Sequence, residues 1–185
     1  MQERNAERTK ARILAAAIDE FAARGIAGGR VDRIAEVAGC NKAMLYAYFG
    51  NKDGLFDAAF SASVAEYLDE VGFDADDLPA YAGRVFDYFE AHPDRLRLST
   101  WYRLERPHGQ PLEAIVAVNA SRLGELQRGM RRRVVPRVFT PVSLLSLIQA
   151  IATSWSSMNP EYGADEPNAT MRRRAVVVAV QKILS

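Results

Sequence analysis

A short segment between residues 42 and 49 carries the side chains best suited to contact a charged partner. Lys42 can donate to a phosphate or to a guanine edge, and Met44 can contact a thymine methyl group. The hydroxyl groups of Tyr46 and Tyr48 can donate to phosphate oxygens. Two alanines between them leave room for close approach to a groove. The candidate contact residues are Lys42, Ala43, Met44, Tyr46, Ala47 and Tyr48.

Three predicted helices would hold this segment in place. The first has apolar residues at helical spacing, and Gly25 is expected to end it as a left-handed cap. A short helix within residues 31–38 and a second at 42–49 flank a turn containing Gly39, with Asn41 as the N-cap. This spacing is typical of a helix-turn-helix. The apolar face of the first helix is formed by Ile13, Leu14, Ala17, Ile18, Phe21 and Ala22.

The stretch from Ile34 to Leu55 reads IAEVAGCNKAMLYAYFGNKDGL. It resembles the signature of the tetracycline-repressor-like (TetR) family, above all in the pattern L-Y-x-Y-F-x-N-K-D-x-L from Leu45 onward, and the resemblance extends back to about Arg8. Helical periodicity along the whole chain already predicts an all-α fold of about nine helices. The resemblance implies a recognition helix at residues 42–49 and a phosphate contact by Lys52 at the start of the fourth helix. The implied function is sequence-specific, regulatory DNA binding.

Several residues depart from the family pattern. Cys40, Asn41 and Ala43 replace the usual Val, Ser and Gly, and the first two keep size or capping chemistry. Gly29 and Arg30 stand where the family usually has Thr or Ser before the second helix. A side-chain cap and a hydroxyl contact to phosphate are therefore not expected there, and Arg30 is predicted to supply a charged contact instead.

The resemblance also implies a C-terminal helical domain that dimerises and binds a small molecule. We expect the DNA-binding domain to span residues 1–55 and the second domain residues 56–185. Two late apolar helices, at about 142–158 and 169–184, are predicted to pair with their symmetry mates as a four-helix interface. The alternative is that their apolar stripes pack inside one subunit. These stripes are Leu144, Leu145, Ile148, Ile151, Ala152 and Trp155, then Val176, Val177, Val180, Ile183 and Leu184.

A ligand site in this domain would be lined by large and occasional polar side chains. The mixture suggests a largely apolar or aromatic effector, with Arg103 or Arg106 as a candidate contact for an acid. For each residue, ordinary core packing is the competing interpretation. The candidates are Phe86, Phe89, Trp101, Tyr102, Asn119, Gln149 and Trp155, with Tyr81 and Met158 as further large side chains.

Charge and composition limit the alternatives. The chain has 24 Lys and Arg against 23 Asp and Glu, and residues 1–50 carry eight against six, so DNA binding would rest on a few placed donors. Two arginine triplets, 131–133 and 172–174, suggest a second DNA surface, although solvated surface charge is the simpler interpretation. The single cysteine, Cys40, and the absence of a long apolar run predict a cytoplasmic protein that does not enter a membrane.

No sequence motif for catalysis, metal binding or a dinucleotide cofactor is present, so we expect neither an enzyme nor a cofactor. The predicted function is a homodimeric regulator on a palindromic operator, most simply a repressor released by a small apolar effector. One alternative is a helix-turn-helix regulator controlled by a protein partner or by abundance. Another is an all-α enzyme or scaffold with a vestigial head.

Overall fold

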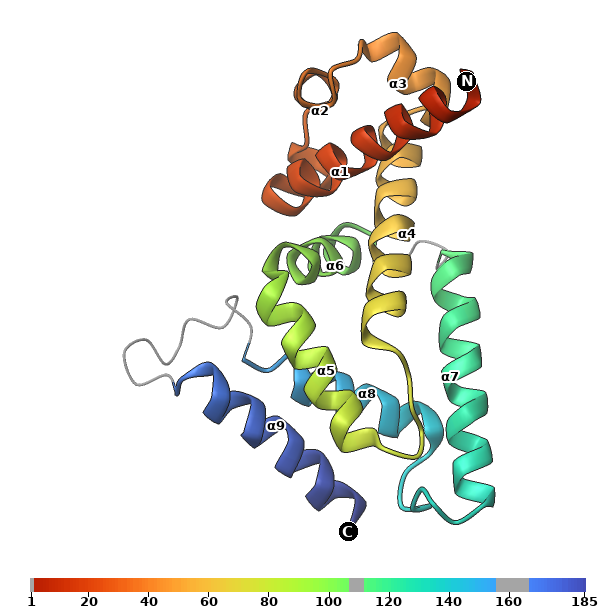
Figure 1. The fold of residues 1–185 in the computed structure, drawn as a ribbon, viewed down its shortest axis with the longest axis vertical. Helices are drawn as coiled ribbons and strands as arrows, with labels where there is room; N and C mark the ends of the chain where they lie inside the picture. Colours follow the sequence, from red (N-terminus) through yellow and green to blue (C-terminus); the bar gives the residue numbers. More distant parts are fainter. Residues whose placement is uncertain (1, 107–111, 156–166) are drawn as a thin grey trace. The chain divides into compact units, whose positions relative to one another are not determined.

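The computed structural model describes residues 2–106, 112–155 and 167–185. Within these ranges the chain forms nine helices and no strand, as the sequence predicts (Figure 1). None of the described helices is long and apolar enough to cross a membrane. The helices are α1 (Gln2–Gly28), α2 (Val31–Ala38), α3 (Lys42–Phe49), α4 (Lys52–Val71), α5 (Leu78–Ala91), α6 (Pro93–Glu105), α7 (Glu113–Arg131), α8 (Pro141–Ala152) and α9 (Ala169–Leu184).

The chain divides into two compact units. Unit 1 comprises Met1–Glu66 and Asp94–Leu112, and unit 2 comprises Tyr67–Pro93 and Glu113–Ser185. Helix α4 is therefore shared, because it begins in unit 1 and its last turn belongs to unit 2. Helix α6 belongs to unit 1 although it follows α5 in the sequence.

Side-chain caps fix where most helices begin. An oxygen of the cap residue accepts a hydrogen bond from a backbone N–H of the first turn, which has no partner inside the helix. The cap by Asn41 is the one predicted above, and four other helices begin in the same way. The bonds are Met44 N to Asn41 (2.7 Å), Gly54 N to Asn51 (2.8 Å), Ala80 N to Asp77 (3.0 Å), Ser143 N to Thr140 (3.2 Å) and Met171 N to Asn168 (3.0 Å).

Two predicted helix ends need correction. Gly25 has the expected positive φ of 72°, but the chain resumes helical geometry after it and α1 extends to Gly28. Helix α8 ends at Ala152 rather than near Met158, because Thr153 leaves helical geometry and donates its hydroxyl to the Gln149 carbonyl (2.8 Å). Met158, the expected end of this helix, lies outside the described residues.

Unit 1 is held together by an aromatic and aliphatic core. Phe21 of α1 meets Phe56 of α4 edge to face, with ring centroids 5.3 Å apart. Leu45 of α3 is fully buried, as its place in the predicted pattern requires. The other fully buried members are Ile13, Ala17, Ile34, Leu55, Ala59 and Leu98.

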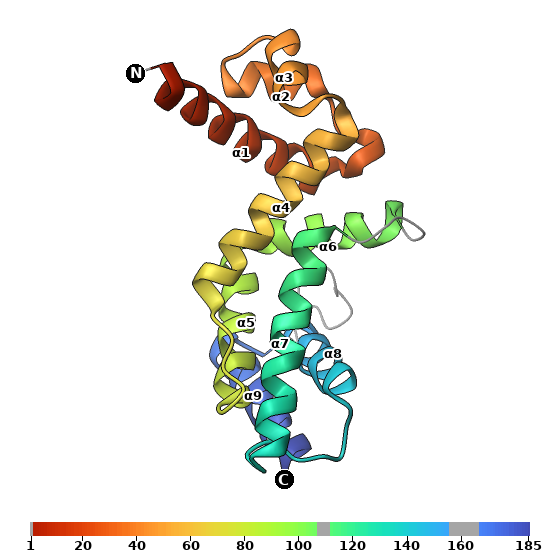
Figure 2. The same ribbon diagram turned by 90° about the vertical axis from the view of Figure 1, so that its right-hand side faces the viewer.

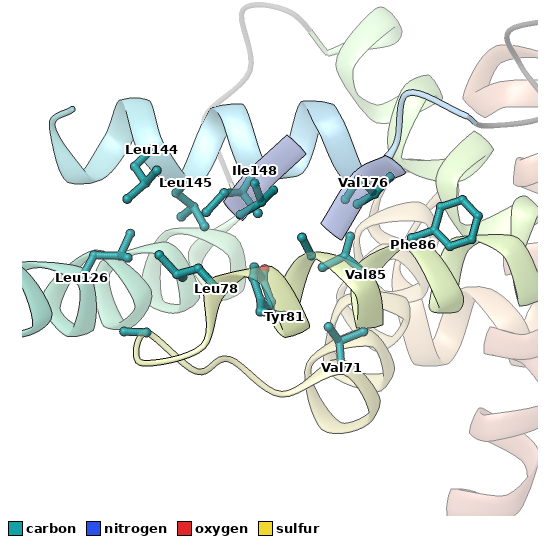
Figure 3. Close-up of a cluster of buried hydrophobic side chains, with 14 of the residues drawn as sticks. Val71, Leu78, Tyr81, Val85, Phe86, Leu126, Leu144, Leu145, Ile148 and Val176 are labelled. Atoms are coloured by element: carbon teal, nitrogen blue, oxygen red, sulfur yellow. The ribbon is translucent and has the colours of Figure 1, made fainter. Parts of the chain in front are cut away.

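Unit 2 has its own core, built on α5. Figure 3 shows Leu144 and Ile148 of α8 projecting toward Leu78 and Tyr81 of α5. Helix α9 also packs on α5, as Figures 1 and 2 show. This core buries Leu144, Leu145, Ile148, Ala152, Val176 and Val180. The alternative interpretation of the two stripes, packing within one subunit, therefore accounts for these six residues.

Candidate functional site

Helix α3 presents nearly all of its side chains to solvent. Leu45 is its only buried residue and Phe49 is half-buried. Apolar Met44 is 41% exposed, and Tyr46 and Tyr48 are exposed to a similar degree. Large apolar side chains left outside on so short a helix indicate a contact surface. The sequence-predicted set Lys42, Ala43, Met44, Tyr46, Ala47 and Tyr48 is exposed as one group.

The turn before α3 fixes how this surface is presented. Gly39 adopts φ 64° and ψ 42°, the left-handed conformation that favours glycine, and its N–H donates to the Glu36 carbonyl (3.1 Å). The Cys40 N–H donates to the Ala35 carbonyl (2.9 Å), so two free carbonyls of α2 are satisfied. The chain then enters α3 at Asn41. This arrangement is the helix-turn-helix that the sequence predicts (Figure 1).

Lys42 forms an ion pair at the edge of this surface. Its Nζ lies 3.0 Å from Oδ1 of Asp32 on α2, and both side chains are largely exposed. The hydrogen bond to Asp32 and its charge raise the pKa of Lys42 above the ordinary value, so the ammonium stays charged at neutral pH. Asp32 thus competes with any anion that Lys42 could bind. The sequence analysis did not identify Asp32 as a partner of Lys42.

Removing this competitor should strengthen DNA binding. We expect Asp32→Asn to raise the affinity for random-sequence DNA several-fold, because the Lys42 ammonium is then free to contact a phosphate. The slope of log affinity against log salt concentration should become steeper by about one, since one more counterion is released. Fluorescence anisotropy across a salt series would measure both. Asp69→Asn in unit 2 removes an equal charge from an exposed site. An equal gain in that control would show that net charge, not Lys42, is responsible.

The start of α2 is fixed without a side-chain cap. Arg30 is the N-cap residue, and its side chain makes no cap hydrogen bond, as the sequence predicts. Instead, its backbone N–H donates to Oε1 of Glu20 on α1 (3.0 Å). Glu20 is buried and also pairs with Arg24 and Arg33, each at 3.3 Å. The Arg30 side chain itself is exposed beside the helix-turn-helix.

Lys52 connects the start of α4 to the end of α1. Its Nζ donates to the Ala27 carbonyl (2.8 Å), which lies in the last turn of α1 and has no partner inside that helix. An ammonium carries three donors, so this bond leaves two for another acceptor. The phosphate contact implied by the family resemblance stays a prediction.

The predicted ligand residues do not form one described group. Trp101 and Tyr102 lie in unit 1, where Trp101 donates to the Ala22 carbonyl (3.2 Å) and Tyr102 stacks on Phe60 at 4.5 Å. Arg106, a candidate contact for an acid, is already paired with Asp53 (2.9 Å) and Asp57 (3.0 Å), while Arg103 is exposed.

The other five candidates lie in unit 2. Phe86 is buried, and Phe89 is half-buried and stacks on Tyr67 at 5.5 Å. Gln149 donates to the Tyr81 hydroxyl at 3.4 Å, whereas Asn119 is exposed. The remaining candidate, Trp155, packs at the edge of the core.

Sequence reasoning missed the buried cation of unit 2. Arg122 on α7 is only 5% exposed, among the rings of Tyr67, Phe73 and Tyr81. The signal was present, because Val118, Arg122, Leu126 and Met130 recur every four residues and share one helix face. Asn119 lies one position off that face.

Three of the six arginines in the two triplets form ion pairs within unit 2. Arg132 pairs with Asp76, Arg172 with Glu90 and Arg173 with Asp87. A cavity of about 450 Å³ lies beside the first of these pairs. Its lining is strongly charged and includes none of the predicted ligand residues: Asp74, Ala75, Asp76, Glu125, Arg128, Arg131 and Arg132.

A helix-turn-helix with an exposed recognition helix, joined to an all-helical second unit, defines a class of DNA-binding transcriptional regulators. Two models of known protein families match this chain and support that class. One for bacterial regulatory proteins of the tetR family matches residues 13–59, and one for the tetracyclin repressor-like C-terminal domain matches residues 77–182. The chain belongs to the TetR family.

Individual relatives support the assignment. The HTH-type transcriptional repressor SCO4008 of Streptomyces coelicolor is 38% identical over 163 residues, which cover 87% of this chain and 84% of that protein. The crystal structure of SCO4942 from the same organism has a TM-score of 0.83 at 40% identity, covering 95% of this chain and 97% of that one. The Bacillus subtilis regulator FadR in complex with stearoyl-CoA shares the fold, with a TM-score of 0.69 at 18% identity over 92% and 96% of the two chains.

Proposed function

We propose that this chain is a homodimeric, cytoplasmic repressor that binds a palindromic operator through α3 and leaves it when a small molecule binds unit 2. The exposed face of α3 carries the proposal. Six neighbouring side chains with donor, apolar or small character face outward, while Leu45 anchors the helix from behind. Close relatives named as repressors favour repression over activation.

The side chains of α3 divide into two roles. Met44 would meet base edges in the major groove, and Ala43 and Ala47 would allow close approach. Lys42 would meet a guanine edge or a phosphate once it exchanges Asp32 for DNA. Tyr46, Tyr48, Arg30 and Lys52 would hold the backbone phosphates and so fix the orientation of the helix.

Two copies would be needed because one recognition helix reads only a few base pairs. Dimers of this class read half-sites about 34–36 Å apart, or somewhat more. Helices α8 and α9 are the proposed interface. They keep apolar side chains at the surface after the core of unit 2 is complete: Val142, Leu147, Met171 and Val178 are all exposed.

Helix α4 would couple the ligand to DNA binding. It begins at Lys52, directly after the helix-turn-helix, and runs without interruption to Val71 in unit 2. A ligand that favours one position of its last turn would change how the two recognition helices fit DNA. The coupling requires different ligand affinities in the two states, typically worth about 1–3 kcal/mol.

Selection of bound DNA from a random pool tests this function. We expect an inverted repeat, because a dimer presents two identical helices related by a twofold axis. With Met44→Ala, we expect the consensus to relax at one position of each half-site while total affinity falls less than about tenfold. The reason is that a thymine methyl contact contributes more to discrimination between bases than to total affinity. Tyr48→Ala serves as the comparison and should weaken all sequences alike.

Two results would contradict the proposal. A consensus with a single half-site would exclude the symmetric dimer on DNA. An unchanged consensus with Met44→Ala would remove that residue from base recognition. Operator binding that no small molecule alters would instead favour control by a protein partner or by abundance.

A further inference from the structure

The buried arginine of unit 2 has no acidic partner among the described residues. Only 5% of the Arg122 surface is exposed, and its Nη2 is buried without a hydrogen-bond partner. No described carboxylate lies within the 4.0 Å of an ion pair. The other buried charge among the described residues is different, because the Glu20 carboxylate in unit 1 pairs with two arginines.

Aromatic rings surround the guanidinium instead. Its Cζ lies 5.2 Å from the ring centroid of Tyr67 and 5.7 Å from those of Phe73 and Tyr81. Ring faces attract a cation, but they do not accept the directional hydrogen bonds of a guanidinium. A buried charge without an anion is costly, so such a group calls for a specific anionic partner.

Neutral donors lie beside the cation. The hydroxyl groups of Tyr67 and Tyr81 are 3.3 Å apart, and Gln149 donates to Tyr81 at 3.4 Å. Burial raises the pKa of Tyr67 far above its ordinary value, although the charge of Arg122 and its hydrogen bond to the Tyr67 hydroxyl act in the opposite direction. The hydroxyl therefore stays protonated and able to donate. A guanidinium fork and phenol hydroxyls together are suited to a carboxylate.

We propose that Arg122 is the anchor for the acid group of the effector, and that the effector is a monocarboxylate with an apolar or aromatic body. This inference rests on the proposed function, which it makes more specific. One buried cation balances one negative charge, which favours a carboxylate over a phosphate dianion. The aromatic rings around Arg122 and the neighbouring hydrophobic core of unit 2 favour an effector whose remaining part is apolar.

The position of the ring partners connects this anchor to the DNA-binding unit. Tyr67 lies in the last turn of α4, the helix that starts beside the helix-turn-helix. A carboxylate bound at Arg122 would take over contacts that the guanidinium now makes with the Tyr67 ring. Phe73 lies just after the end of α4 and is half-buried, so its ring is one that could move to make room.

A probe series tests the charge requirement directly. The full chain would be titrated with 3-phenylpropionate and octanoate, and separately with their neutral amides, while its melting temperature and its affinity for the selected operator are followed. We expect the acids to raise the melting temperature and weaken operator binding, and the amides to do neither. Arg122→Met should weaken the apparent affinity for the acids by about tenfold or more, because a charge-assisted contact is lost.

Matched variants separate this site from general charge effects. Arg128→Met removes an exposed arginine from the same helix and should respond as the parent chain does. Arg122→Lys keeps the charge without the fork and should recover part of the response, which also covers the case in which Arg122→Met folds poorly.

Several outcomes would overturn the proposal: a response to the amides, a full response in Arg122→Met that matches Arg128→Met, or no response to either acid. Failure of the proposed function is distinguishable from these results. A chain that selects no operator contradicts DNA binding, while the melting temperature still reports on the acid site.

Discussion

Replacing Gly25 with alanine is expected to destabilise unit 1 by about 2–5 kcal/mol, the sum of backbone strain and overpacking. Gly25 adopts φ 72° and ψ −179°, a conformation that side chains with a Cβ rarely reach. An alanine Cβ there would also clash with Oε1 of Glu105 and lie 3.0 Å from the Trp101 ring. Urea unfolding monitored by tryptophan fluorescence would show the loss as a lower midpoint.

The expected cost is high because Gly25 lies where three helices meet. Backbone groups beside this break and at the end of α1 make hydrogen bonds with side chains of α6 and α4. Trp101 donates to the Ala22 carbonyl (3.2 Å), Glu105 accepts from the Ala27 N–H (2.8 Å), and Lys52 donates to the Ala27 carbonyl (2.8 Å). A Cβ at Gly25 would push on two of these three partners. We therefore expect operator affinity to fall together with stability. Lys52 is the first residue of α4 and a predicted phosphate contact, so a shift of its partner Ala27 would also displace that contact.

Two other glycines separate strain from clash. Gly39 has a similar φ of 64°, but a Cβ there would meet nothing within 4 Å, so Gly39→Ala should cost only about 1–2 kcal/mol of backbone strain. Gly28 has ordinary geometry and a single contact at 3.4 Å, so its alanine variant should be nearly neutral. Equal losses at Gly25 and Gly39 would show that the contacts with Glu105 and Trp101 contribute nothing.

Local patterns predicted the helix-turn-helix well because its determinants lie close together in the sequence. Leu45 is the one buried residue of α3, and Asn41 and Gly39 act at the positions that turn geometry requires. Helix ends were less predictable. The continuation of α1 past Gly25 depends on partners about 80 residues away, such as Glu105, which local rules do not see.

The candidate ligand site was less predictable for the same reason. Residue size identified Trp101 and Tyr102, yet in unit 1 both are engaged in contacts within that unit. Polarity on an apolar helix identified Asn119, which is exposed, whereas Arg122 three residues later is buried. Choosing between them requires the exact helix phase, and that phase is set by packing against Tyr67 and Tyr81.

Glu20→Ala is expected to destabilise unit 1 by about 2–3 kcal/mol, with the loss centred on α2. Glu20 is 6% exposed, and its carboxylate accepts from the Arg30 N–H at 3.0 Å while pairing with Arg24 and Arg33. Truncation would leave the Arg30 N–H without its acceptor and remove a negative charge from the start of α2, where the helix dipole favours one. The two arginines are about half exposed, so water would solvate their charges and keep the cost below that of a fully buried pair.

Variants of neighbouring carboxylates make this result specific. Glu20→Gln keeps an oxygen that can accept from Arg30 but loses the charge, and should lie between the parent chain and Glu20→Ala. Asp19→Ala changes an exposed acid one residue earlier in the same helix and should shift stability by less than about 0.5 kcal/mol. Amide exchange should quicken first in α2, because this carboxylate joins it to α1. Uniform quickening across unit 1, or equal losses from Glu20→Ala and Asp19→Ala, would contradict a specific role for Glu20 at the start of α2.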